Sequence, residues 1–127
     1  MPLAKHIVNL NEYDLTGTPE AFTDAITALA TKTEAEGHRG VLRYSFYVDE
    51  QAGTAAANIV YADADAWIDH HKMVYDWPEM PAFQATVKLR RITFLGPFNQ
   101  AMQDWLDGAN IAVPITRIDH LAAGFER

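Results

Sequence analysis

The sequence has no cysteine among its 127 residues. Disulfide bridges and thiolate metal sites are therefore excluded, and the apolar core must hold the fold. A chain without cysteine suits a reducing compartment, so we expect a cytoplasmic location. No apolar run approaches the roughly 20 residues that a membrane-spanning helix needs. The opening residues, MPLAKH, also lack the apolar centre of a signal peptide.

Positive charge is scarce as well. Ten lysine and arginine residues stand against 17 aspartate and glutamate residues, which gives a formal net charge of −7. The densest basic segment is residues 88–91, and on a strand its side chains would alternate between opposite faces. This composition argues against a protein that binds nucleic acid through its phosphates. It fits one globular domain.

Hydrophobic periodicity predicts the order strand, helix, strand, strand, helix, strand. Thr18 and Pro19 mark the start of the first helix, and Gly37 marks its end. Asp63 or Asp65 can cap the second helix, which runs to about residue 75. A short helix follows at about residues 79–85. The predicted strands are 6–13, 41–48, 54–61 and 87–95.

This order is the split βαβ, or ferredoxin-like, arrangement with an antiparallel sheet. A further helical face follows in residues 98–106 and ends at Gly108, and residues 111–118 form an extended tail. Pro114 suits an edge strand or an arm. We therefore predict an α+β fold. A ferredoxin-like domain spans residues 1–97, and a C-terminal helix and extended arm of the same domain span residues 98–127.

Both faces of the predicted sheet carry aromatic side chains. Tyr44 and Phe46 fall on one face of their strand, and Tyr47 falls on the other. Two helices can cover only one face, so the other face needs a second copy of the chain or the folded-back C-terminal segment. We predict a homodimer joined through the sheet faces, with the C-terminal segment as the alternative cover.

The second helix and the turn after it hold a cluster of polar aromatic side chains: Trp67, His70, His71, Tyr75 and Trp77. Helical spacing predicts a buried stripe with Trp67, His71 and Tyr75, and it places His70 on the flank. Such a stripe either lines a pocket for a planar ligand or packs as core with satisfied polar tips. Because the adjacent histidines diverge by about 100°, no metal site is predicted.

The element order and three short motifs resemble the antibiotic-biosynthesis monooxygenase-like family of dimeric α+β barrel proteins. The motifs are Tyr61–Asp63 at a strand end, Trp67 with His71 in the next helix, and Pro81–Phe83 in the short helix. The resemblance covers residues 5–95. It implies a reactive pocket between the helices and the sheet, lined by an Asn, a Trp and a His or Tyr.

On this resemblance the candidate catalytic residues are His71, Asn9 and Tyr75. The candidate substrate-binding residues are Trp67, Asn58, His70, Trp77 and Phe83, with Asn58 as a rival of Asn9 for the amide role. Haem-degrading members carry a His about three turns beyond the Trp. This chain has Trp77 there, which disfavours haem. Many relatives also have a His just before the Phe of the short helix, where this chain has Ala82.

The resemblance implies a small monooxygenase that uses no cofactor or metal and acts on a phenolic, quinol or polyketide-like substrate. The substrate then supplies the electrons as a phenolate or enolate. His71 suits the role of proton acceptor, because the ordinary pKa of histidine lies near neutrality. An Asn N–H suits the developing oxyanion. Two alternatives remain open: an isomerase or cyclase of enolisable substrates, and a non-catalytic dimer that binds a small aromatic molecule.

Overall fold

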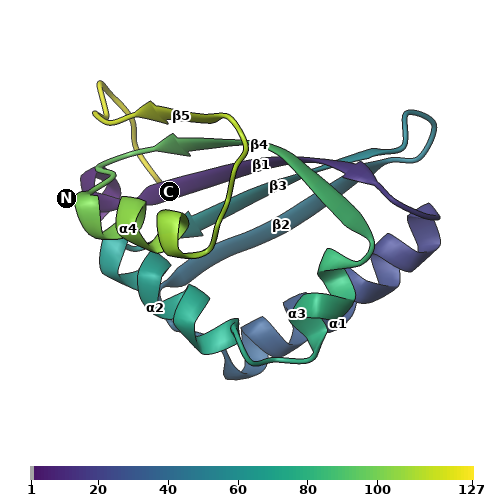
Figure 1. The fold of residues 1–127 in the computed structure, drawn as a ribbon. Helices are drawn as coiled ribbons and strands as arrows, with labels where there is room; N and C mark the ends of the chain where they lie inside the picture. Colours follow the sequence, from purple (N-terminus) through teal and green to yellow (C-terminus); the bar gives the residue numbers. More distant parts are fainter. Residues whose placement is uncertain (1) are drawn as a thin grey trace.

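A five-stranded sheet with helices on one face forms the framework of the computed structural model, which describes residues 2–127 (Figure 1). A short 3₁₀ helix (Pro2–Lys5) precedes the first strand. The strands are β1 (Ile7–Leu15), β2 (Val41–Asp49), β3 (Thr54–Tyr61), β4 (Val87–Leu95) and β5 (Ile115–Ile118). The α-helices are α1 (Pro19–Glu36), α2 (Ala64–Val74), α3 (Glu79–Gln84) and α4 (Gln100–Gly108).

The strand order is β2-β3-β1-β4-β5. β1 runs antiparallel to both β3 and β4, and β2 runs antiparallel to β3. This is the ferredoxin-like order, so the predicted fold class is confirmed. β5 joins the edge of the sheet parallel to β4, as the proline at position 114 led us to expect of an edge strand.

Side-chain caps set the start of the two long helices. The Thr18 hydroxyl accepts a hydrogen bond from the Ala21 N–H at 3.1 Å, and the Asp63 carboxylate accepts one from the Ala66 N–H at 2.8 Å. Both satisfy a backbone donor that the first turn of a helix leaves unpaired. The Asp63 cap fixes where α2 begins, and it therefore fixes which α2 side chains reach the sheet.

Alternation along β1 decides what faces the helices. Ile7, Asn9, Asn11 and Tyr13 point to the helix-covered face, where they lie beside Tyr61, Ile59, Ala57 and Ala55 of β3. The intervening residues Val8, Leu10 and Glu12 point to the helix-free face. α1 packs against α3, and α2 packs against α4. The core lies between these helix pairs and the sheet, with two asparagine amides on its sheet side.

The C-terminal segment extends the sheet and then returns to the start of β1. Glu126 Oε1 lies 3.8 Å from His6 Nδ1, and Gly124 lies beside Leu3. Tyr47, in the helix-free face at the far edge strand, keeps 59% of its surface exposed. In the described part of the chain, no helix combines the length and apolar character needed to cross a membrane.

Candidate functional site

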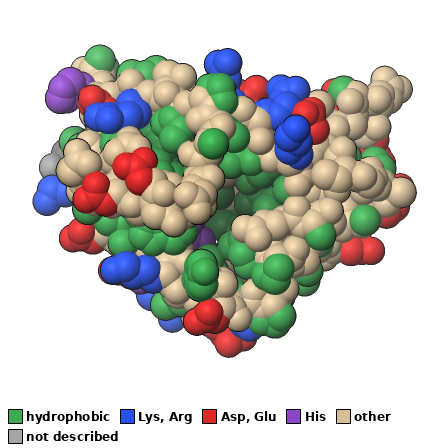
Figure 2. Space-filling model, viewed as in Figure 1, with side chains coloured by type: hydrophobic (Ala, Val, Ile, Leu, Met, Phe, Trp, Pro, Cys, Tyr) green, Lys and Arg blue, Asp and Glu red, His purple; other side chains and the backbone are tan. Residues whose placement is uncertain are grey.

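The helix-covered side of the molecule is hollowed. Figure 2 shows a recess between the part with α2 and α4 and the part with α1 and α3, walled by apolar side chains, with a histidine at its edge. Several side chains on this side, from the sheet and from α2 and α4, are only half-buried: Asn11, Tyr44, Phe46, His71, Leu89 and Trp105. An asparagine on a central strand reaches water only through such an opening. We call this recess the interior hollow.

Trp67 forms one wall of the site and is 1% exposed. Its indole Nε1–H donates a 2.9 Å hydrogen bond to Oδ1 of Asn9, which is itself 3% exposed. The ring also packs edge-on against Phe94, with 5.8 Å between centroids. Trp67 is therefore a core residue whose only polar group is satisfied by β1.

His71 lies against this wall. Its ring centroid is 4.1 Å from that of Trp67 and 5.1 Å from that of Trp105 on α4. His71 Nδ1 is 2.7 Å from the Trp67 backbone oxygen. A carbonyl oxygen can only accept, so in the neutral ring Nδ1 carries the hydrogen and Nε2 keeps a free lone pair. This tautomer leaves Nε2 able to take a proton from a ligand.

Burial changes the titration of His71. Desolvation lowers its pKa from 6.5 to about 4, and the hydrogen bond to the Trp67 carbonyl opposes that shift. The pKa of His71 in the fold thus lies below the ordinary histidine value, because the charged ring loses its water contacts beside the two indoles. At neutral pH the ring is uncharged and can accept a proton.

His70 is the more deeply buried histidine, at 2% exposure. Its ring lies 5.5 Å from that of Tyr61 and 6.0 Å from that of Tyr44. Its Nδ1 atom has no hydrogen-bond partner among residues 2–127. Desolvation, together with the neighbouring His71 and His38, lowers its pKa to about 3. His70 therefore fills the space between α2 and the sheet as a neutral ring.

Tyr75 lies outside this cluster. α2 ends at Val74, and Tyr75 is its C-terminal cap with 73% of its surface exposed. The expectation of a buried Tyr75 on the Trp67 stripe is wrong. Eight residues at about 100° each place Tyr75 some 80° away from Trp67, whereas three residues place His70 only about 60° away. The helix therefore buries His70 in its place.

The other predicted binding residues separate in space. Asn58 pairs with Leu10 and with Ser45 across the sheet, so it belongs to the helix-free face and cannot share a site with Trp67. Trp77 is half-buried beneath the Lys32 ammonium, which lies 4.7 Å from the ring centroid. Phe83 is a core residue, 5.8 Å from the Tyr13 ring.

Asn11, Tyr13 and Trp105 belong to the site although the sequence analysis did not select them. Asn9 Nδ2–H donates to Asn11 Oδ1 at 2.7 Å, and Asn11 Nδ2–H donates to the Tyr13 hydroxyl oxygen at 2.8 Å. The alternation of β1, which sets Asn9 and Asn11 on one face, was the available signal for Asn11. Trp105 reaches His71 only through tertiary packing, for which the sequence holds no local signal.

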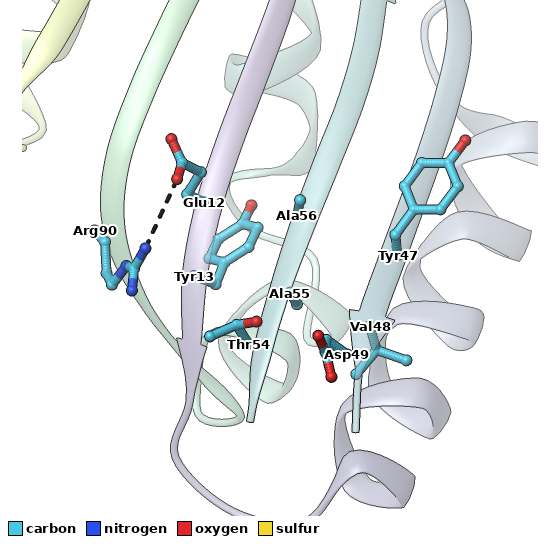
Figure 3. Close-up of a pocket in the computed structure, with 9 residues that line it drawn as sticks. All are labelled: Glu12, Tyr13, Tyr47, Val48, Asp49, Thr54, Ala55, Ala56 and Arg90. Atoms are coloured by element: carbon cyan, nitrogen blue, oxygen red, sulfur yellow. Dashed lines mark ion pairs between the residues drawn. The ribbon is translucent and has the colours of Figure 1, made fainter. Parts of the chain in front are cut away.

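A second, shallow pocket lies near the β2–β3 turn and is drawn in Figure 3. It includes Tyr47 and Ala56 of the helix-free face. Tyr13 also lines it, as do Glu12 and Arg90, which form an ion pair with 3.7 Å between Oε1 and Nη2. None of the predicted site residues lines it. Within residues 2–127, no three histidine or carboxylate side chains gather closely enough to hold a metal ion.

No protein-family model matches the sequence, and no curated protein does. Solved structures do match. MupZ from Pseudomonas fluorescens is 20% identical, with 97% of this chain and 95% of that chain covered and a TM-score of 0.65. SnoaB, a cofactor-independent oxygenase from Streptomyces nogalater, is 17% identical, with 68% of this chain and 88% of that chain covered and a TM-score of 0.60.

A third structure is a Caulobacter crescentus CB15 protein provisionally named an antibiotic biosynthesis monooxygenase. It is 20% identical, with 68% of this chain and 89% of that chain covered and a TM-score of 0.52. The MupZ match spans nearly the whole chain, so it includes the C-terminal helix and arm. The chain therefore has the fold of the antibiotic-biosynthesis monooxygenase-like proteins, as the resemblance in its sequence predicts.

Proposed function

We propose that this protein is a small cofactor-independent monooxygenase that acts on a phenolic, quinol or polyketide-like substrate in the interior hollow. The observation that carries the proposal is the setting of His71. Its ring packs against the indoles of Trp67 and Trp105, and its Nδ1 donates to a carbonyl oxygen, so Nε2 is left as a base. The shared fold with SnoaB, which is described as a cofactor-independent oxygenase, supports the same reaction class.

The reaction balances without an external reductant. A methylene group activated by aromatic rings becomes a carbonyl, while O₂ gives one oxygen atom to the product and the other to water. The substrate supplies all four electrons, and it can do so only after a proton leaves to form a phenolate or enolate. His71 Nε2 takes that proton. The resulting imidazolium is stable beside the substrate anion, because an opposite charge offsets the desolvation that lowers its pKa.

Oxygen uptake tests this proposal. The purified protein, with a metal chelator present, is offered anthrone-like phenols and quinols in an oxygen electrode. We expect one molecule of O₂ consumed for each molecule of oxidised product, at a rate proportional to protein concentration. Activity that is seen only when the chelator is omitted would contradict the mechanism. Conversion of a substrate without oxygen consumption would favour an isomerase or cyclase.

We also propose that the protein is a homodimer joined through its helix-free sheet faces. That face carries half-buried Val8, Leu10 and Val60 at its centre, beside the exposed Tyr47 and Ala56 of the pocket in Figure 3. The C-terminal segment leaves Tyr47 exposed, so a second copy is the simplest cover for the apolar centre.

Light scattering at micromolar concentration is expected to give about twice the mass of one chain. Tyr47→Glu should shift the protein toward monomer, because it places a charge in an apolar contact. Lys5→Glu, on the exposed 3₁₀ helix before β1, is the matched control and should leave the mass unchanged. A wild-type monomer at this concentration would refute the dimer.

A further inference from the structure

The polar side chains on the helix-covered face of β1 form a continuous chain of hydrogen bonds. It runs from the Trp67 indole to Asn9 at 2.9 Å, to Asn11 at 2.7 Å and to the Tyr13 hydroxyl at 2.8 Å. Asn9 and Tyr13 are four residues apart, so the chain spans about 13 Å along the strand. It crosses the floor of the interior hollow, where Asn11 is half-buried.

The hydrogen bonds in this series can run in only one direction, from donor to acceptor. An indole N–H can donate but cannot accept, so the oxygen of Asn9 must face Trp67. The Asn9 nitrogen then faces the oxygen of Asn11, and the Asn11 nitrogen faces the oxygen of Tyr13. Each amide orientation is therefore set by the one before it, and Trp67 fixes them all.

Two hydrogen-bond donors are left unused at the Tyr13 end of this series. The Asn11 amide uses one N–H on Tyr13 and keeps a second, and the Tyr13 hydroxyl accepts from Asn11 and so keeps its own hydrogen to donate. No acceptor for that hydrogen is found among residues 2–127. Burial raises the pKa of Tyr13 to about 12, so the hydroxyl stays protonated throughout the physiological range.

We infer that Asn11 and Tyr13 form a donor pair that binds an acceptor oxygen of the substrate, such as a ketone, a quinone carbonyl or a phenolate. The inference rests on the proposed function, because it takes the interior hollow as the substrate site. It adds the feature that selects the substrate: an oxygen that accepts hydrogen bonds, presented away from His71. Asn9 is a positioning residue: the Trp67 N–H fixes its amide orientation, and the Asn9 amide in turn fixes that of Asn11.

The test measures binding and needs no turnover. Calorimetry compares anthraquinone-2-sulfonate, which carries two carbonyl oxygens, with anthracene-2-sulfonate, which has the same ring skeleton without them. The wild-type protein is expected to bind the quinone more tightly. Tyr13→Phe keeps the ring and removes the donor, and it should weaken quinone binding by about 3- to 10-fold. The affinity for the anthracene probe should not change.

Two further variants sharpen the result. Asn11→Ala should also reduce the quinone preference, and the double variant should lose less than the product of the two single losses, because the two donors act together. Tyr75→Phe makes the same change at an exposed tyrosine outside the cluster and should alter neither affinity. Thermal melts confirm that each variant is folded.

Each outcome of these measurements either supports or overturns the donor pair. An unchanged quinone preference in Tyr13→Phe, or an equal loss for both probes, overturns the donor pair even if the protein consumes oxygen. A lost preference in Tyr13→Phe supports the donor pair even if no substrate is oxidised, in which case the monooxygenase proposal alone fails. A wild-type protein that binds neither probe overturns both.

Discussion

Replacing His71 with alanine is expected to lower kcat by about 10²–10⁴-fold on any substrate that the protein oxidises, because a positioned general base is typically worth that factor. The initial rate of oxygen uptake measures the loss. Added imidazole should restore part of the rate by entering the space left beside Trp67 and Trp105. His38→Ala changes a half-buried histidine near Asp69 and should leave the rate unaffected. Full turnover in His71→Ala would exclude this residue as the base.

The pH profile gives the same residue a second, independent signature. The base must be unprotonated, so kcat/KM falls as the pH drops through the pKa of the free enzyme. Because burial lowers the pKa of His71 to about 4, the rate should hold from neutrality down to about pH 5 and then decline. An ordinary histidine, with its pKa of 6.5, would lose half of its rate at pH 6.5. A midpoint there would show that another group is the base.

Replacing Trp67 with alanine is expected to destabilise the fold by about 3–5 kcal/mol, the usual cost of removing a fully buried large aromatic side chain. The change also removes the donor that fixes Asn9 and a packing partner of Phe94. The melting temperature should fall by roughly 10–20 °C for a domain of this size. Differential scanning calorimetry measures the shift. A near-wild-type melting temperature would contradict a role for Trp67 in stabilising the core.

Trp67→Phe separates the two contributions of this side chain. Most of the apolar contact remains, while Oδ1 of Asn9, a residue that is 3% exposed, loses the one hydrogen-bond partner it has within residues 2–127. An unpaired buried acceptor costs about 1–3 kcal/mol. Trp77→Phe is the matched control, because Trp77 is only half-buried and donates no side-chain hydrogen bond within residues 2–127. Equal effects of the two replacements would contradict a structural role for the indole N–H.

Local signals in the sequence were sufficient for the fold. Thr18 and Asp63 start α1 and α2 because a short oxygen-bearing side chain satisfies a free backbone N–H, whatever the rest of the chain does. Strand alternation likewise depends only on the backbone, so the four antiparallel strands were predicted closely. The helix stripe brought Trp67 and His71 together correctly, since both follow from the spacing of a single helix.

Tertiary relations account for what the sequence could not supply. Asn58 and Asn9 were both candidates for the amide role, because the face on which a strand residue lies is unknown until the register with the neighbouring strand is known. That register puts Asn58 opposite Leu10, on the helix-free face. Trp105 meets His71 through the packing of α4 on α2, across 34 residues of chain. The pKa of His71 depends on that same packing, so composition alone could not provide it.

The strand order also dictates when the molecule can assemble. β1 is synthesised before both of the strands that it pairs with, β3 and β4, and it lies between them in the sheet. Val8 can therefore pair with Val60 and Leu95 only after both of those strands have been synthesised. Loop closure over such separations slows folding. Until β4 emerges, a growing chain carries β1 with one unpaired edge, which invites pairing with other chains. Sequence changes that slow the docking of β4 should therefore reduce the yield of folded protein before they reduce its stability.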